Sequence, residues 1–299
     1  MRFIFDVAEL APGIGKSLGI YNYARNLFRE LVSVLPPDAE MLVTCNAGCA
    51  PDFSAPGCQQ VVQHVVLADV MPGTLARQRW IRYGAQAFAH MQQVSVYVSP
   101  KGFLPGFWRK PRGLTTVAVV HDLIPLWYAE HHPETFGRLE RWVVNGGLLR
   151  SARWADELIV ISQATADDVA RRVGRSLADM HVVHNGVPFV EPAESLLMDQ
   201  PYIFAISSEL PHKNAAVLLD AYARYRKGCV HPLPLVVCGL PDPGQDGVQA
   251  VRGLDNATLH AYYRSARLFV FLSLIEGFGF PPLEAMSHGT PVLCSDIAA

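Results

Sequence analysis

Residues 155–173 read ADELIVISQATADDVARRV and place a short apolar run directly before a helical pattern. The run at 158–161 is apolar and rich in β-branched residues, which is typical of a buried strand. Apolar residues then recur at helical spacing through 164–173. Ser162 stands between the two segments, and a serine at this point accepts hydrogen bonds from the first free amides of a helix, so we expect it to be the N-cap. The stretch therefore predicts a strand that leads into a helix.

The same alternation extends over most of the chain before this stretch. Low polar alternation within the apolar runs indicates burial on both faces, as in a parallel sheet covered by helices. The expected strands are 3–5, 41–43, 61–62, 65–66, 94–98, 116–120 and 182–183, and the expected helices are 20–35, 75–91 and 136–151. This pattern predicts an α/β fold with a doubly wound, Rossmann-like domain over residues 1–190.

A second domain of the same type is expected after a break. Residues 187–201 contain three prolines and little periodicity, so we place a linker at 191–201. Strands at 202–206, 235–238, 248–251, 268–272 and 292–294 then alternate with helices at 215–226, 257–266 and 282–288. Because each strand of a parallel sheet is normally covered by a returning helix, the second domain, 202–299, is expected to be incomplete at its C-terminal end.

Composition excludes several classes of protein. Hydrophobic residues make up 50% of the chain and charged residues 17%, which argues against disorder. The net charge of −2 argues against a nucleic-acid partner. No uninterrupted apolar run reaches the roughly 18 residues of a membrane span, so a cytoplasmic protein is expected. Cys45, Cys49 and Cys58 lie near His64 in the sequence but match no common zinc-ligand spacing, so no metal site and reduced thiols are expected.

Two segments of the first domain are candidate site loops. Gly13 and Gly15 lie between the first strand and the first helix, where glycine lets the backbone approach a ligand and the helix offers free amides to an anion. A flexible turn is an equal alternative. His121 ends the apolar strand 116–120, a usual place for an active-site residue, and a surface histidine is the alternative.

The segment EGFGFPPLE, residues 276–284, is the most informative part of the second domain. Glu276 follows an apolar strand, and Gly277 and Gly279 allow a tight turn before a helix that begins near two prolines and contains Glu284. Two carboxylates around a helix N-terminus can hold hydroxyl groups of a ligand while the amides face its phosphates. A helix cap with a surface glutamate is the alternative interpretation.

Two further features remain open at this point. Lys213 lies at a strand-to-helix junction, where a lysine can serve as a point charge for phosphate, although exposed lysines are common. Residues 102–113, GFLPGFWRKPRG, mix aromatic and basic side chains. This mixture suits a peripheral membrane contact or a lipid-linked substrate, and equally a loop that packs its aromatic residues into the domain.

Taken together, these motifs resemble the family-4 retaining glycosyltransferases of the GT-B fold, and within them the mannosyltransferases. The matching segments are the GIG loop at 13–15 with Tyr21 beyond it, VHDLIPL at 120–126, ADELIVIS at 155–162, VVHNGV at 182–187, LPHKN at 210–214, LHAYYRSA at 259–266 and EGFGFPPLEAMSHGTPVLCSD at 276–296. The resemblance implies two Rossmann-like domains that face a cleft. It also implies transfer of a sugar from a GDP- or UDP-sugar donor to a glycan or lipid-linked oligosaccharide in surface polysaccharide or lipopolysaccharide synthesis, with no cofactor or metal required.

The resemblance also assigns roles to the candidate residues. Glu276 would contact hydroxyls of the donor sugar, and Glu284 the ribose. Lys213 would neutralise the diphosphate, and His121 would lie near the reacting centre. The other residues that it implies for donor binding are Gly13, Gly15, Ser208, Gly253, Leu254, Gly277, Phe278 and Gly279.

The chain departs from the family pattern at several points. Many relatives carry an arginine where this chain has Ser207 or Ser208, and a basic residue other than histidine at His212, so weaker neutralisation of the diphosphate is expected. The family pattern also continues beyond position 299 with a further helix. The alternatives are therefore a catalytically impaired nucleotide-sugar-binding fragment of such an enzyme and, disfavoured by EGFGFPPLE, a sugar-nucleotide epimerase.

Overall fold

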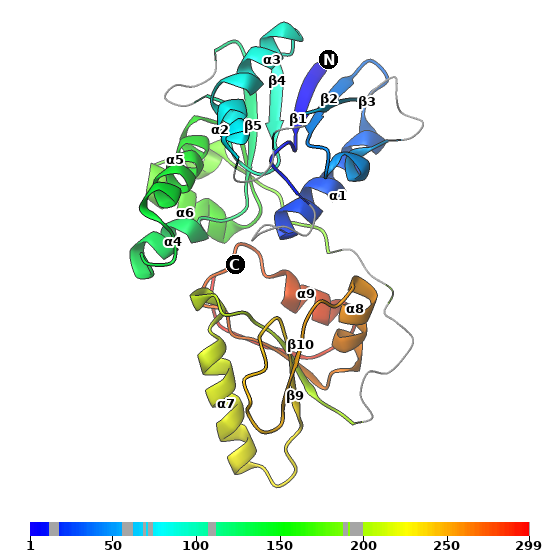
Figure 1. Cartoon of the computed structure of the whole chain (residues 1–299), viewed down its shortest axis with the longest axis vertical. Helices are drawn as coiled ribbons and strands as arrows, with labels where there is room; N and C mark the ends of the chain where they lie inside the picture. Colours follow the sequence, from blue (N-terminus) through cyan, green and yellow to red (C-terminus); the bar gives the residue numbers. More distant parts are fainter. Residues whose placement is uncertain are drawn as a thin grey trace. The chain divides into compact units, whose positions relative to one another are not determined.

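The chain divides into two compact units, Met1–Asn185 and Gly186–Ala299, in the computed structural model (Figure 1). The structure describes residues 1–11, 18–55, 62–67, 70, 74–106, 112–187, 191 and 200–298. Gly13, Gly15, Cys58 and most of the expected linker lie outside these residues.

A seven-stranded parallel sheet forms the centre of the first unit. Its strands lie in the order β3-β2-β1-β4-β5-β6-β7. They are β1 (Arg2–Asp6), β2 (Glu40–Cys45), β3 (Val62–Val66), β4 (Val96–Ser99), β5 (Thr115–Val120), β6 (Glu157–Val160) and β7 (His181–Val182). This is the Rossmann order, in which the direction of winding reverses between β1 and β4.

Helices cover both faces of this sheet because successive strand residues point to opposite sides. Phe3 and Phe5 pack with Phe28 on one face, whereas Ile4 packs with Trp80 on the other. The helical segments are α1 (Leu18–Val34), η1 (Ala50–Phe53), α2 (Leu75–Arg79), η2 (Trp80–Gly84), α3 (Ala85–Met91), α4 (Ile124–His131), α5 (Arg138–Trp154), α6 (Gln163–Val173) and η3 (Leu177–Asp179).

Local expectations for the first unit are confirmed at some points and wrong at others. Ser162 is the N-cap of α6, and its hydroxyl oxygen accepts a hydrogen bond from the Thr165 amide at 3.1 Å. The single helix expected at 75–91 is interrupted by a π-helical turn, η2. Helix α4 was not expected, because its sequence IPLWYAEH is apolar on most sides and has no amphipathic pattern. Burial on both faces was wrong for the edge strands β3 and β7: both residues of β7 are exposed, and in β3 only Val62 is buried.

The second unit repeats this architecture around a five-stranded parallel sheet. Its order is β10-β9-β8-β11-β12, again the Rossmann order, with the reversal between β8 and β11. The elements are β8 (Ile203–Ile206), η4 (Pro211–Lys213), α7 (Ala215–Gly228), β9 (Leu235–Cys238), β10 (Val248–Val251), α8 (Asn256–Ser265), β11 (Leu268–Phe271), α9 (Phe280–Ser287) and β12 (Val292–Cys294). The predicted fold of two doubly wound Rossmann-like units is confirmed.

Two small cores hold the second unit together. Phe204 and Phe269 pack with Tyr263 of α8 on one face of the sheet, where Ala285 of α9 is also buried. Ala205 and Val270 point to the opposite face and pack with residues of α7. Figure 1 shows α7 on one side of this sheet and α8 with α9 on the other.

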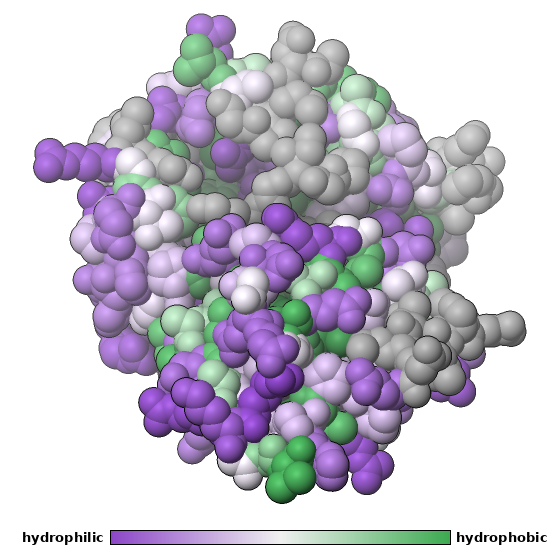
Figure 2. Space-filling model, turned by 60° about the horizontal axis from the view of Figure 1, so that its bottom comes forward, coloured by the Kyte–Doolittle hydropathy of each residue, from purple (hydrophilic) through white to green (hydrophobic). Residues whose placement is uncertain are grey.

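The surface mixes polar and apolar residues (Figure 2), and Cys45 and Cys49 are buried. Hydrophilic and hydrophobic residues alternate in small groups on the face shown in Figure 2. Within the described part of the chain, no helix is long and apolar enough to cross a membrane. Burial raises the pKa of Cys45 to about 11 and that of Cys49 to about 12, so both are protonated core thiols at neutral pH.

Candidate functional site

An ion pair lies where the winding of the second sheet reverses. Lys213 follows β8 through η4, and Glu276 follows β11, and these two strands are neighbours. The Lys213 Nζ donates to Glu276 Oε1 at 2.6 Å, and the two side chains are 21% and 13% exposed. Lys213 Nζ also lies 5.1 Å from the centroid of the Phe271 ring. Ligands of doubly wound sheets bind outside the carboxyl ends of the strands at this reversal, so the pair occupies the expected ligand position.

The loop that carries Lys213 is anchored by buried groups. The Ser207 hydroxyl donates to the Lys213 carbonyl at 3.1 Å, and the Leu274 amide donates to the His212 carbonyl at 2.8 Å. Burial, followed by the charge of Lys213, lowers the pKa of His212 to about 4. His212 is therefore neutral at pH 7 and adds no charge for an anion. Ser208 Oγ accepts from the Leu210 amide at 3.4 Å, so this side chain also supports the turn.

The glycine turn after Glu276 leads into α9. Gly279 is the residue before α9 and has φ +85°, a left-handed conformation that glycine adopts without strain. Proline occupies the first turn of α9, as the sequence predicts. Gly277, Phe278 and Gly279 thus join the carboxyl end of β11 to a helix N-terminus, a type of terminus that attracts anions.

Glu284 lies within α9 and faces α8. Its Oε2 accepts a hydrogen bond from the Tyr263 hydroxyl at 2.8 Å. Burial raises the pKa of Glu284, and burial together with this carboxylate raises the pKa of Tyr263 well above its usual value. Close by, His260 Nδ1 and His288 Nε2 are 2.6 Å apart, so one ring nitrogen donates to the other. Sequence reasoning missed Tyr263 and this histidine pair, although LHAYYRSA places both Tyr263 and His260 in one motif.

Gly253 and Leu254 follow β10 at the same edge of the sheet. Gly253 has φ +67°, and the Leu254 side chain packs against the core formed by Tyr262 and its neighbours. Because all five strands are parallel, these residues share an edge with Lys213 and Glu276. The second unit therefore brings most of the predicted donor-binding residues to one edge.

His121 follows β5 in the first unit and is only 8% exposed. Its Nε2 lies 2.7 Å from the Pro100 carbonyl oxygen. Since a carbonyl can only accept, Nε2 carries the proton and Nδ1 is the unprotonated nitrogen. Burial lowers the pKa of His121 to about 4, so the ring is neutral at pH 7. The Tyr23 ring meets it edge-on, with the centroids 4.7 Å apart.

Sequence reasoning overlooked a second group of buried charges in the first unit. The Glu9 carboxylate follows β1 and accepts from Arg77 Nε at 2.7 Å, and Lys101 Nζ lies 3.5 Å from it. The Asp6 carboxylate at the end of β1 accepts from Trp80 Nε1 at 3.1 Å and from the Tyr97 hydroxyl. It also accepts from the Thr44 hydroxyl of β2 and from the Ala8 amide in the loop after β1. The available signal was a carboxylate at the end of β1, Asp6, and a second one, Glu9, three residues later.

Comparisons with known proteins agree with this architecture. The family model described as Glycosyltransferase Family 4 matches residues 19–189, and that described as Glycosyl transferases group 1 matches 190–299. The O-antigen chain mannosyltransferase RfbU of Salmonella typhimurium is 28% identical over 194 residues, which cover 60% of this chain and 51% of the relative. The MMP alpha-(1->4)-mannosyltransferase of Mycolicibacterium hassiacum is 31% identical over 206 residues, 64% of this chain and 44% of the relative. The chain thus spans about half the length of these relatives.

Solved structures show the same fold at low sequence identity. WaaG, a glycosyltransferase involved in lipopolysaccharide biosynthesis, is 16% identical with a TM-score of 0.63, over 100% of this chain and 82% of that chain. The sucrose-phosphate synthase from Thermosynechococcus elongatus is 16% identical with a TM-score of 0.67, over 99% and 81%. With a family match over more than half of its length and the Rossmann strand order in both units, this chain belongs to glycosyltransferase family 4 and has the GT-B fold.

Proposed function

We propose that this chain transfers a sugar, with retention of configuration, from a nucleoside diphosphate sugar to a glycan or lipid-linked acceptor during synthesis of surface polysaccharide or lipopolysaccharide. The single observation that carries the proposal is the Lys213–Glu276 ion pair at the reversal of the second sheet. The mannosyltransferase names of the relatives favour a GDP-mannose-like donor. We place this reaction on the cytoplasmic side of the membrane.

The ion pair suits a leaving diphosphate. As the glycosidic bond breaks, negative charge grows on the nucleoside diphosphate, and a fixed cation that meets this charge lowers the barrier. Lys213 supplies the cation, and the amides of 277–279 add partial positive charge at the start of α9. The reaction in this proposal needs no metal ion.

Glu276 has two functions in this proposal. In the free protein its carboxylate holds the Lys213 ammonium in place at 2.6 Å. With the donor bound, Lys213 turns to the phosphate oxygens, and Glu276 accepts hydrogen bonds from hydroxyls of the sugar. In this exchange the Lys213 charge meets the charge of the phosphate, and the Glu276 carboxylate remains hydrogen-bonded.

The remaining assignments follow the edge of the sheet. Glu284 accepts hydrogen bonds from the ribose, the backbone at Gly253 and Leu254 holds the base, and Ser208 lines the diphosphate site. In the first unit we assign His121 to the sugar, with its unprotonated Nδ1 as an acceptor, and Gly13 and Gly15 to the diphosphate.

Substitution of the ion pair tests the proposal. Glu276→Gln and Lys213→Met should each reduce kcat about 100-fold or more, because each removes a charge that acts on the transition state. Glu209→Gln removes an exposed carboxylate of the same loop and serves as the matched control with unchanged activity. Turnover is measured with GDP-mannose and a panel of UDP-sugars, with and without EDTA.

Calorimetry with the same donors separates the two candidate functions. Binding with turnover that Glu276→Gln abolishes supports a transferase, whereas binding without turnover identifies a nucleotide-sugar-binding protein. Full activity of both substituted proteins would overturn the assignment of this site.

A further inference from the structure

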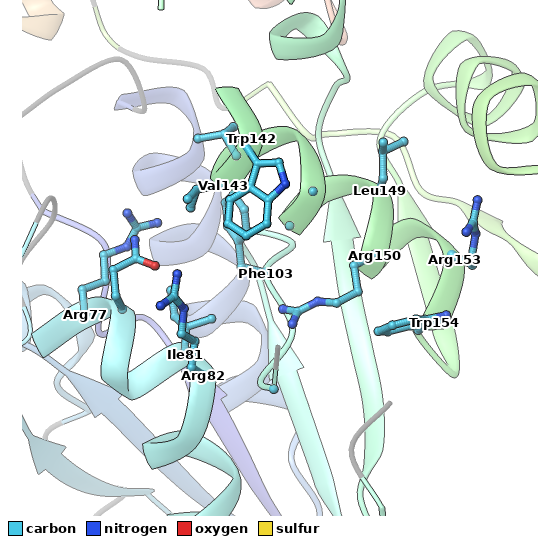
Figure 3. A pocket seen from close by; sticks show the side chains of 15 residues that line it. Arg77, Ile81, Arg82, Phe103, Trp142, Val143, Leu149, Arg150, Arg153 and Trp154 are labelled. Atoms are coloured by element: carbon cyan, nitrogen blue, oxygen red, sulfur yellow. The ribbon is translucent and has the colours of Figure 1, made fainter. Parts of the chain in front are cut away.

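A pocket of about 340 Å³ is lined by residues of the first unit. One wall is the continuous helical segment α2–η2, the other is α5, and Phe103 and Gly106 from the loop after β4 complete the lining. Figure 3 shows the Trp142 ring and the Arg150 guanidinium extending from α5 into the space between the two walls, whereas Leu149 and Arg153 extend away from α2–η2. The volume is that of a site for a small ligand.

The lining of this pocket is strongly biased in charge. It includes Arg77 and Arg82 on one wall and Arg150 and Arg153 on the other, and no described Asp or Glu contributes to it. The surrounding sequence has the same bias, since residues 70–121 contain seven Lys and Arg and no Asp or Glu in a chain of net charge −2. Arg77 is paired with Glu9, whose carboxylate is not among the groups that line the pocket. Such a surface favours an anion.

Arg150 is held in position by a hydrogen bond to the backbone. Its Nη2 donates to the Leu104 carbonyl at 2.5 Å, and its Nε is buried without a hydrogen-bond partner among the described residues. Figure 3 shows its guanidinium reaching from α5 toward Ile81 and Arg82. Burial lowers the pKa of Arg150, but a guanidinium remains charged at neutral pH. A buried cation with an unmet donor is stabilised by an anion that accepts from it.

The pocket also has an apolar component. Ile81, Phe103, Trp142 and Leu149 line it beside the arginines. Phe103 packs so closely on α5 that a Cβ at Gly147 would lie 2.6 Å from its ring, which explains a glycine inside this helix. Gly146, in contrast, lines the pocket, and a Cβ there would meet no atom within 4 Å. The absent side chain at 146 therefore leaves space in the pocket and serves no close packing.

We infer that this pocket binds the phosphate group of a phosphate ester, with Arg150 and Arg82 on the phosphate and the apolar wall on the group that the phosphate carries. The inference rests on the proposed function in one respect: in a transferase this ligand is the phosphate-bearing part of the acceptor. Two acceptors share this chemistry, a prenyl phosphate and a phosphorylated sugar. Binding itself is independent of the donor site.

Calorimetry on the full chain tests the inference with geranyl phosphate, mannose 1-phosphate and inorganic phosphate, and with geraniol as the uncharged control. We expect a phosphate ester to bind and geraniol not to bind. Arg82→Gln and Arg150→Gln should each weaken binding about tenfold or more, because each removes a charge-assisted hydrogen bond. Arg171→Gln, at an exposed arginine of α6, is the matched control and should leave binding unchanged. Tighter binding of geranyl phosphate assigns a lipid acceptor, and tighter binding of mannose 1-phosphate assigns a sugar.

A second variant keeps the test decisive if Arg150→Gln disturbs folding through the lost Leu104 contact. Gly146→Leu adds a side chain where the structure has open space, so it should fold and block the pocket. The inference is overturned if the phosphate esters still bind to both Arg82→Gln and Gly146→Leu. It is also overturned if neither ester binds and the chain instead associates with anionic vesicles. Donor binding, measured with GDP-mannose, should be unchanged in both variants. If the proposed function is wrong, the donor does not bind or is not turned over. If only this inference is wrong, donor binding and turnover are as proposed, and the phosphate esters do not bind in the pocket.

Discussion

Two neutral histidines, His121 directly after β5 and His212 in η4, connect individual residues to the pH response of the protein. His121 and His212 are both buried, and burial lowers the pKa of each to about 4. In an unfolded chain both would titrate near 6.5. The unfolded state therefore binds more protons than the folded state between about pH 6.5 and pH 4, and stability falls as the pH drops through this window.

At this scale we predict that His121→Gln reduces the acid sensitivity of folding. Because folding lowers the pKa of this ring from about 6.5 to about 4, protonation of the ring should reduce the free energy of unfolding by about 3 kcal/mol between pH 7 and pH 4. Glutamine can still donate to the Pro100 carbonyl but does not titrate. Urea unfolding at pH 7 and pH 4 measures the difference, with His131→Gln at an exposed position of α4 as the control. An unchanged pH dependence in His121→Gln would show that this ring is not the acid-sensitive group.

The ends of strands and the turns that follow them position the site in the second unit. Gly239 follows β9 with φ +101°, and a Cβ there would lie 2.4 Å from the Ser207 carbonyl oxygen. Ser207 in turn holds the carbonyl of Lys213 through its hydroxyl. A close approach of two strand ends thus supports the loop that carries the lysine.

At the scale of these elements we predict that Gly239→Ala both destabilises the unit and weakens donor binding. The new Cβ must displace backbone and adopt a strained φ, which should cost about 2 kcal/mol of unfolding free energy. Displacement of Ser207 should also raise the KM for the donor. Gly228→Ala, at the end of α7, where a Cβ meets no neighbour, is the control and should be neutral or stabilising. Stability and KM equal to those of the control would contradict this account.

Separate hydrophobic cores characterise the whole molecule. The clusters around Phe5, Trp80 and Leu158 lie within the first unit, and those around Phe269 and Val270 lie within the second. Because large-to-small substitutions in a core act on the packing of that core, each unit should respond to its own substitutions.

We predict two unfolding transitions in scanning calorimetry of the whole chain. Phe269→Ala should lower the Tm of one transition and Phe5→Ala that of the other, each by the equivalent of about 3–5 kcal/mol. A nucleoside diphosphate should raise the transition that Phe269→Ala lowers, since a ligand stabilises the unit that binds it. One transition lowered equally by both substitutions would contradict independent cores, and a nucleotide effect confined to the other transition would place the donor site in the first unit.

Local chemistry accounts for what could be read from the residues alone. Strand and helix periods, the Ser162 cap and the glycine and proline positions around α9 depend on neighbours a few residues apart, so they are visible along the chain. Helix α4 was not predicted because its apolar residues show no helical periodicity. The exposure of β3 and β7 was not predicted either, because the sequence does not show that these two strands lie at the edges of the sheet.

Contacts between distant residues required the folded structure. Lys213 and Glu276 are 63 positions apart, and each was a candidate by its place after a strand, but their ion pair depends on β8 and β11 being neighbours. The same holds for Glu9 with Lys101 and for the arginine pocket between α2–η2 and α5. Strand order and helix packing arise from the burial of whole faces, a property of the entire unit, and they alone bring these charges together.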